Sequence, residues 1–174
     1  IKAKYVLYNG VDPEKFHPIR GLKDKKIFKI GCIANFWPLK DQITLLKAAS
    51  NLIDKKGLTN LRIQFIGSGE TLNTCKAFVK EQNMQKFIEF SSEIDHAALN
   101  TFYNTLNLFV LPSYHEAFGC VYTEAYACGV PFMAVHKQGI SELIPEDEKD
   151  NWLIEKGNFK MLSNIILQYN IHKF

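Results

Sequence analysis

Short apolar segments alternate with longer segments of helical periodicity along most of this chain. Their composition and spacing predict strands over residues 27–34, 61–67, 87–91, 106–111 and 131–135. Helices are predicted over residues 40–55, 70–83, 95–105, 119–128 and 159–169, with a short one near residues 141–144. Strands that are apolar along their length are typical of a parallel sheet covered by helices on both faces. The chain is therefore predicted to be one α/β domain with a doubly wound, Rossmann-like parallel sheet, which binds its ligands at the carboxyl ends of the strands.

The charge balance is mildly basic, with 21 Lys and Arg against 18 Asp and Glu and a net charge of +3. This excess suits anionic ligands and is too small to indicate nucleic-acid binding. The arginines among the basic residues are Arg20 and Arg62, and arginine is the residue type that most often reads bases, so no nucleic-acid partner is expected. The lysine-rich run at residues 23–26 is interpreted as a solvated loop, with contact to anionic lipid headgroups as the alternative.

The four cysteines form no Cys-x-x-Cys pair and have no histidine at metal-ligand spacing. They are interpreted as buried free thiols of a reducing compartment. No apolar run approaches the roughly eighteen residues of a membrane span, and no signal peptide opens the chain. We therefore expect a cytoplasmic protein. Peripheral contact with the inner face of the membrane is the alternative location.

Two carboxylates, Glu116 and Glu124, stand eight positions apart where nothing else is charged. They follow the predicted strand 106–111, and Gly129 and Pro131 end the helix that carries Glu124. The positions one helical turn from Glu124 hold cysteine, valine and alanine. A carboxylate there costs several kcal/mol unless something hydrogen-bonds it. An internal salt bridge or a capping contact is therefore the structural alternative to a ligand-binding role.

Residues 116–134 resemble the E-x7-E signature of retaining glycosyltransferases of the GT-B fold, the family-four-like enzymes also called glycosyl transferases group 1. The family phrase is approximately E-G-F-G-L-x-x-x-E-A-M-A-x-G-x-P-V-V-A, and the matching residues are Glu116, Phe118, Gly119, Glu124, Ala125, Ala127, Gly129, Pro131 and Ala134. By this resemblance Glu116 would bind hydroxyls of the donor sugar, and Glu124 the ribose hydroxyls of the nucleotide. The amides of Phe118, Gly119, Cys120 and Val121 would lie at a helix N-terminus, where free N–H groups and the helix dipole favour a diphosphate.

Other turns carry further parts of the resemblance. In the turn 34–41 the family places an arginine and, five residues on, a lysine, both on the diphosphate. Here Lys40 keeps the lysine place, Asn35 takes the arginine place and Asp41 that of a following glycine, so one cationic contact is missing. A solvated lysine at the start of a helix is the structural alternative for Lys40.

Three more turns complete the comparison. Gly67 and Gly69 resemble a G-x-G turn that lines the donor cleft, although two glycines alone do not make a dinucleotide fingerprint. The turn with Glu93 and Ile94 would hold the nucleobase through backbone groups. Residues 138–142 resemble a G-G-x-x-E loop that closes on the donor, with Gln138 in the place of one glycine.

Residues 9–18 match the phrase N-G-V-D-x-x-x-F-x-P that begins the C-terminal half of these enzymes. We therefore expect residues 1–18 to be an interdomain linker with the first segment of the domain, and residues 19–174 to be a C-terminally truncated domain that binds a nucleotide-sugar donor. The expected partner is the N-terminal, acceptor-binding domain of a longer chain. This fragment alone is expected to be inactive.

The implied reaction moves a sugar from a nucleoside-diphosphate sugar, such as a UDP or GDP sugar, to a glycan, a lipid or another acceptor. Lys40 and the amides of Gly119 and Cys120 would stabilise the leaving diphosphate, and Glu116 would position the sugar. Because no Asp-x-Asp motif is present, neither a metal nor a cofactor is expected. One alternative is a nucleotide-sugar epimerase of similar fold. The other is a non-catalytic nucleotide-binding relative, and the asparagine at position 35 in place of the family's arginine favours this second alternative.

Overall fold

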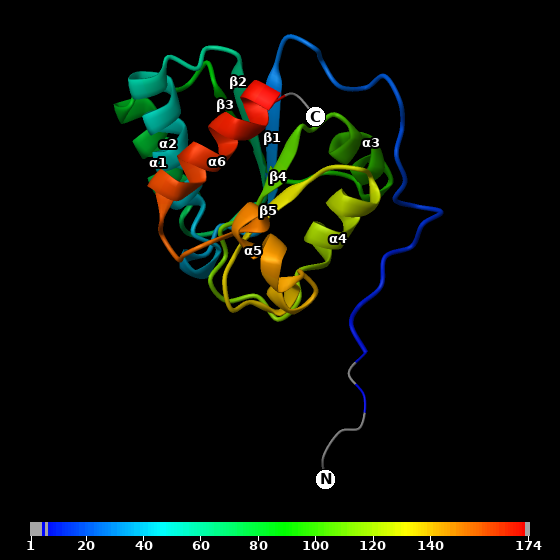
Figure 1. Cartoon of the computed structure of the whole chain (residues 1–174). Helices are drawn as coiled ribbons and strands as arrows, with labels where there is room; N and C mark the ends of the chain where they lie inside the picture. The colour runs from blue at the N-terminus through cyan, green and yellow to red at the C-terminus, as the bar shows by residue number, and fades with distance from the viewer. Residues whose placement is uncertain (1–4, 6, 173–174) are drawn as a thin grey trace.

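The computed structural model describes residue 5 and residues 7–172, the last of these by its backbone alone. Six parallel strands form one sheet in the order β3-β2-β1-β4-β5-β6 (Figure 1). The strands are β1 Phe28–Ile33, β2 Leu61–Ile66, β3 Ile88–Ser91, β4 Leu108–Val110, β5 Phe132–Val135 and β6 Leu153–Ile154. This is the order of a doubly wound sheet, and it confirms the predicted fold class.

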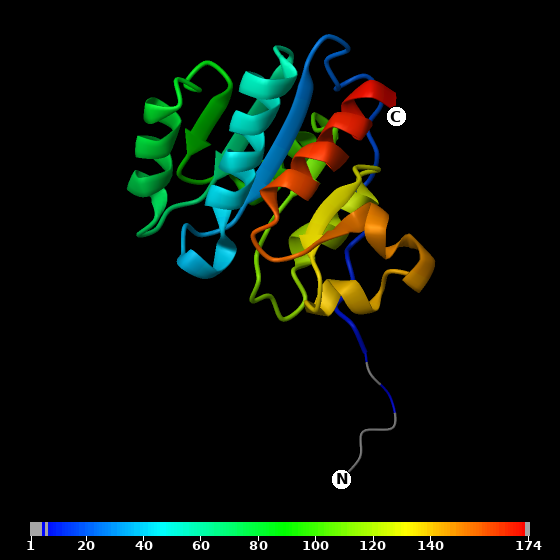
Figure 2. The ribbon, with the colours of Figure 1, turned by 60° about the vertical axis from the view of Figure 1, so that its left-hand side comes forward.

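Helices cover both faces of the sheet. The α-helices are α1 Gln42–Ser50, α2 Leu72–Glu81, α3 Leu99–Asn104, α4 Cys120–Ala127, α5 Lys149–Trp152 and α6 Phe159–His172. Helix α1 packs between α2 and α6 on one face, whereas α3 packs against α4 on the other (Figures 1 and 2). Shorter helical turns are η1 Pro38–Lys40, η3 His96–Ala98, η4 Gly139–Glu142 and η5 Glu146–Glu148, and a π-helical turn, η2 Asn51–Lys55, follows α1.

The core explains why the strands are apolar throughout. Every residue of β4 and β5 is buried, because helices cover both faces of these central strands. On the side of α3 and α4, the ring of Phe109 in β4 lies edge-on between those of Tyr103 and Tyr122, at centroid distances of 5.7 and 6.0 Å. These two tyrosines, from different helices, are among the largest fully buried side chains.

The structure differs from the predicted elements in a few places. Strand β6 and helix α5 were not predicted, because two and four residues are too short to show a periodicity. The predicted helix 40–55 is divided: Asp41 has a left-handed φ of 48°, which separates η1 from α1. The prediction of buried thiols is wrong for Cys120, which is exposed at the first position of α4, whereas Cys32, Cys75 and Cys128 are buried.

The segment before β1 is docked on α3. The side chain of Asn104 accepts from the N–H of Ile19 at 2.6 Å and donates to the carbonyl of His17 at 2.9 Å. Phe16 is buried and meets Tyr103 edge-on at 6.0 Å. The blue chain in Figure 1 therefore runs along the side of the domain that carries α3 and α4. Within the part of the chain that the structure describes, no helix has the length and apolar character needed to cross a membrane.

Candidate functional site

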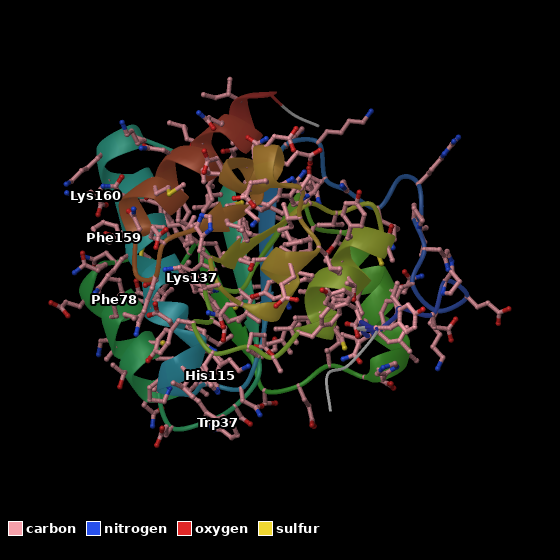
Figure 3. The ribbon with its side chains drawn as sticks, turned by 60° about the horizontal axis from the view of Figure 1, so that its bottom comes forward. Trp37, Phe78, His115, Lys137, Phe159 and Lys160 are labelled. Carbon is pink, nitrogen blue, oxygen red and sulfur yellow. The ribbon has the colours of Figure 1, made fainter. Side chains whose placement is uncertain are left out.

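The strand order reverses beside β1, which has β2 on one side and β4 on the other. Because β1 and β4 lead to helices on opposite faces, the loops after them part at the edge where the carboxyl ends of the strands lie. We call this the carboxyl edge, and the opposite one the amino edge. Figure 3 looks onto the carboxyl edge, where Trp37, His115 and Lys137 mark the loops after β1, β4 and β5.

Lys40 and Glu116 meet at this edge. The Nζ atom of Lys40 lies 2.5 Å from Oε2 of Glu116, and the two side chains keep 19% and 17% of their exposure. Their loops are joined directly, because the carbonyl of Leu39 accepts from the N–H of Tyr114 at 3.1 Å and from Oγ of Ser113 at 3.2 Å. Lys40 is therefore not the solvated lysine of the structural alternative. It is a partly buried cation held against one of the two predicted carboxylates.

The loop after β5 contacts the main chain of Glu116. The N–H of Glu116 donates to Oε1 of Gln138 at 2.8 Å, and the N–H of Gly139 donates to the carbonyl of Glu116 at 3.3 Å. A Cβ on Gly139 would lie 1.7 Å from the carbonyl oxygen of Ala117, so this position needs glycine. The G-G-x-x-E-like loop therefore packs directly on the loop that carries Glu116.

Helix α4 begins beside this pair. Gly119 precedes the helix with a φ of 80° and makes no side-chain cap, so the N–H groups of the first turn, Cys120 and Val121, point out of the helix end. Their partial positive charge favours an anion. Phe118 is buried, and the ring of Tyr8 stacks on it at 6.0 Å. The Tyr8 hydroxyl also donates to Glu142 at 2.9 Å, so the segment before β1 reaches the side of the site.

Glu124 is half-buried on α4, and its carboxylate accepts a hydrogen bond from a tyrosine. The hydroxyl of Tyr103 donates to Oε2 of Glu124 at 2.8 Å. Burial, and then the charge of Glu124, raises the pKa of Tyr103 far above its ordinary value, so the phenol remains a donor over the whole working range of pH. Glu124 takes part in none of the ion pairs among the described residues. The salt-bridge alternative therefore does not apply to Glu124.

The glycines after β2 are required by packing between two loops. A Cβ on Gly67 would lie 2.1 Å from the carbonyl oxygen of Ala34, and one on Gly69 would lie 2.5 Å from that of Phe36. The N–H of Phe36 donates to the carbonyl of Ser68 at 2.8 Å. Gly67 and Gly69 thus let the loop after β2 support the loop that carries Lys40.

The remaining predicted residues lie at the same edge without joining the pair. The side chain of Asn35 is exposed, and the main-chain carbonyl of Asn35 accepts from Nε2 of the buried Gln42 at 3.0 Å. Glu93 is exposed and Ile94 half-buried in the turn after the outer strand β3. Within residues 7–172, no hydrogen bond or ion pair joins the side chains of Asn35, Glu93 or Ile94 to Lys40 or Glu116.

Sequence reasoning missed two contributors to this site: Tyr103 and the side chain of Gln138. Tyr103 lies 21 residues from Glu124 in the sequence, and only the packing of α3 on α4 brings them together. The signal for Gln138 was present, because a glutamine there replaces a glycine of the family phrase.

A large cavity lies away from these residues. It measures about 840 Å³ at the amino edge, between the end of α4, α5 and the second half of α6, and its lining includes Tyr126, Trp152 and Gln168. None of the predicted site residues lines it. Over the described part of the chain, no cluster of three or more His, Cys, Asp or Glu residues has the arrangement of a metal site.

Comparison with known proteins decides the family. The family model described as "Glycosyl transferases group 1" matches residues 13–170. The chain belongs to this family. Among its relatives, the capsular polysaccharide biosynthesis glycosyltransferase CapM of Staphylococcus aureus is 31% identical over an alignment of 169 residues that covers 94% of this chain and 41% of CapM. The chain thus spans less than half the length of this relative.

Solved structures share the fold. The C-terminal domain of LpcC, a group 1 protein from Francisella tularensis, matches with a TM-score of 0.79 and 25% identity over 94% of this chain and 89% of that domain. Anabaena HepE, solved with UDP and glucose, matches with a TM-score of 0.80 and 20% identity over 94% of this chain and 46% of HepE. The resemblance inferred from the spacing of Glu116 and Glu124 is therefore confirmed at the level of the family and of the GT-B fold.

Proposed function

We propose that this chain is the donor-binding, C-terminal domain of a retaining glycosyltransferase that takes a UDP sugar. The observation that carries the proposal is the pairing of Lys40 with Glu116 beside the N-terminus of α4, at the switch point of the sheet. The similarity to the C-terminal domain of LpcC over 89% of that domain supports the assignment to a C-terminal half. The UDP bound to HepE supports the choice of nucleotide.

The cation and the helix end have complementary roles toward a diphosphate. Lys40 supplies a full positive charge, and the N–H groups of Cys120 and Val121 supply hydrogen-bond donors. When the bond between the anomeric carbon and the diphosphate oxygen breaks, the electron pair stays on the diphosphate, and these groups stabilise the charge that develops there. The acceptor hydroxyl forms the new bond on the face that the diphosphate leaves and gives its proton to the departing diphosphate oxygen, so the anomeric configuration is retained.

The two carboxylates bind opposite ends of the donor. In the chain without ligand, Lys40 and Glu116 neutralise each other. A bound donor replaces that contact: its diphosphate takes Lys40, and its sugar hydroxyls donate to Glu116. Glu124, oriented by Tyr103, accepts from the ribose hydroxyls. Because Lys40 and the amides of α4 supply the charge that the diphosphate needs, we propose that the reaction requires neither a metal nor a cofactor.

Acceptor binding belongs, in this proposal, to an N-terminal domain of the full-length enzyme, which works in the cytoplasm. In the same proposal, the exposed Lys25 and Lys26 contact anionic lipid headgroups on the inner face of the membrane. No feature of the described residues favours an epimerase over a transferase.

A thermal-shift screen of UDP, GDP, ADP and their sugars against the purified chain tests the nucleotide assignment. A ligand that binds only the native state stabilises it by RT ln(1 + [L]/Kd), so UDP and a UDP sugar are expected to raise the melting temperature in proportion to ln[L]. If no nucleotide raises it at millimolar concentration, the proposed function is wrong.

The full-length enzyme tests the reaction itself. It is expected to transfer the sugar with retention of configuration and to keep its activity in EDTA, whereas this chain alone should not transfer. Positioning two reactants can lower a barrier by about 7–11 kcal/mol, and one domain lacks the acceptor half of that geometry. An inverted product, or activity that EDTA removes and magnesium restores, would contradict the mechanism.

A further inference from the structure

The backbone of Glu116 is held independently of its carboxylate. Lys40 contacts the carboxylate, whereas Oε1 of Gln138 accepts from the main-chain N–H of Glu116 at 2.8 Å. The Gly139 N–H donates to the carbonyl of the same residue at 3.3 Å. The loop after β5 therefore holds the peptide groups on both sides of the Glu116 Cα.

Gln138 is itself fixed at several points. Its main-chain carbonyl accepts from the N–H and from Oγ of Ser141 at 2.9 and 2.6 Å, and its side-chain Nε2 donates to the carbonyl of His136 at 3.3 Å. Lys137, just before it, has a left-handed φ of 63°, which turns the chain sharply into Gln138. A residue whose main chain and side-chain amide are both hydrogen-bonded loses little further conformational freedom when a ligand binds. It is therefore suited to hold another residue in place.

We propose that Gln138 is a positioning residue for sugar recognition, which acts by fixing the main chain of Glu116. The inference rests on the proposed function, in which Glu116 accepts from the sugar hydroxyls. Donor binding draws Lys40 toward the diphosphate, and the carboxylate then loses the cation that directs it. Gln138 does not contact the carboxylate, so its hold persists in the donor complex. A glycine, which the family phrase has at this position, offers no side-chain acceptor for the Glu116 N–H.

The test compares how much the sugar adds to nucleotide affinity. Calorimetric titrations of the parent chain give Kd for UDP and for three UDP sugars: UDP-glucose, UDP-galactose and UDP-N-acetylglucosamine. The ratio of Kd for UDP to Kd for the UDP sugar measures what the sugar adds to affinity. The variants are compared with the sugar that gives the largest ratio in the parent. Gln138→Met keeps the length of the side chain and removes the acceptor. It is expected to lower the ratio about three- to tenfold, the value of one neutral hydrogen bond, and to leave the affinity for UDP unchanged. Gln85→Met, at an exposed glutamine near the amino edge, is the matched control and should change neither.

A double variant shows whether Gln138 acts through Glu116. If it does, Gln138→Met should lower the ratio no further once Glu116→Gln is present, because the residue it positions is already impaired. Additive losses, or a Gln138→Met ratio equal to that of the parent, would overturn this inference and leave the proposed function intact. A parent chain that binds no nucleotide would overturn the proposed function itself. A parent that binds UDP but gains nothing from any sugar would overturn the role of Glu116 and this inference with it.

Discussion

At the scale of single residues, the site is an ion pair at the end of a helix. Lys40 and Glu116 are each about four-fifths buried, and each is the other's charged partner in the chain without ligand. Neither could be buried alone at low cost, because an uncompensated charge loses its hydration. The pair therefore places a cation and a carboxylate side by side where, in the proposed function, a diphosphate and a sugar would bind them separately.

Lys40→Ala is expected to weaken UDP binding by about 1–3 kcal/mol, the range for a hydrogen bond to a charged group. Lys149→Ala is the matched control, because Lys149 also pairs with a glutamate, Glu146, but away from the carboxyl edge. Titration calorimetry on both variants checks the prediction. Equal affinities in Lys40→Ala and the parent would remove Lys40 from the diphosphate site.

The two glutamates should separate by ligand. Glu124→Gln is expected to weaken UDP itself about tenfold, since it removes the charged acceptor for the ribose, at about 1.4 kcal/mol per decade. Glu116→Gln should leave UDP unchanged and weaken only the UDP sugar. Tyr103→Phe, which removes the donor to Glu124, should share the Glu124 pattern to a smaller degree. If both glutamate variants bind both ligands like the parent, the two carboxylates have only a structural role.

At the scale of elements, the loops after β1, β2, β4 and β5 support one another at the carboxyl edge. Gly67 brings the loop after β2 against the loop that carries Lys40, and Gly139 brings the loop after β5 against the loop that carries Glu116. The position of the ion pair therefore depends on contacts between backbones that larger residues would prevent.

Gly67→Ala tests this dependence. Its φ of 143° and the 2.1 Å approach of a Cβ to the Ala34 carbonyl oxygen predict a loss of about 1–3 kcal/mol from backbone strain alone. Gly10→Ala is the control, because a Cβ there meets nothing within 4 Å and is expected to change stability by less than about 0.5 kcal/mol. Urea unfolding measures both. Similar stabilities for the two variants would show that the close approach is not needed.

The sequence was sufficient to predict the strands and helices that are marked by a local pattern of apolar residues. Five of the strands and the longer helices follow from apolar runs, and Gly129 ends α4 with a φ of 72°, as its glycine predicts. Contacts that depend on tertiary structure were not predictable. The bond from Tyr103 to Glu124 needs α3 packed on α4, and the bond from the Glu116 N–H to Gln138 needs two loops of adjacent strands in register.

At the scale of the whole molecule, the buried thiols make the free energy of unfolding pH-dependent in the alkaline range. Burial raises the pKa of Cys75 and of Cys128 from 9.0 to about 11, and that of Cys32 higher still. Because the folded pKa lies above the unfolded value, the folded state holds the proton longer. The contribution of the protonated thiols to the free energy of unfolding is complete below the unfolded pKa and is lost as pH rises through the folded pKa.

The free energy of unfolding is therefore expected to fall as pH rises from about 9 toward 11, the interval between the unfolded and folded pKa of Cys75 and Cys128. Urea titrations under reducing conditions at a series of pH values measure this slope. Cys75→Ala should make the slope shallower, whereas Cys120→Ala, at the exposed cysteine, should leave it unchanged. A stability that is constant over this interval would contradict the assignment of buried, protonated thiols.

The location of the nucleotide is the central claim, and the cavity of about 840 Å³ at the amino edge is the alternative to the carboxyl edge. With a mass of 20.0 kDa, the chain suits amide mapping by NMR during a titration with UDP. The amides of Lys40, Cys120 and Val121 are expected to shift and saturate together, while those of Tyr126, Trp152 and Gln168 around the amino-edge cavity stay in place. Shifts confined to the amino-edge residues, or saturation without any change at Cys120 and Val121, would contradict the assignment of the donor site to the carboxyl edge.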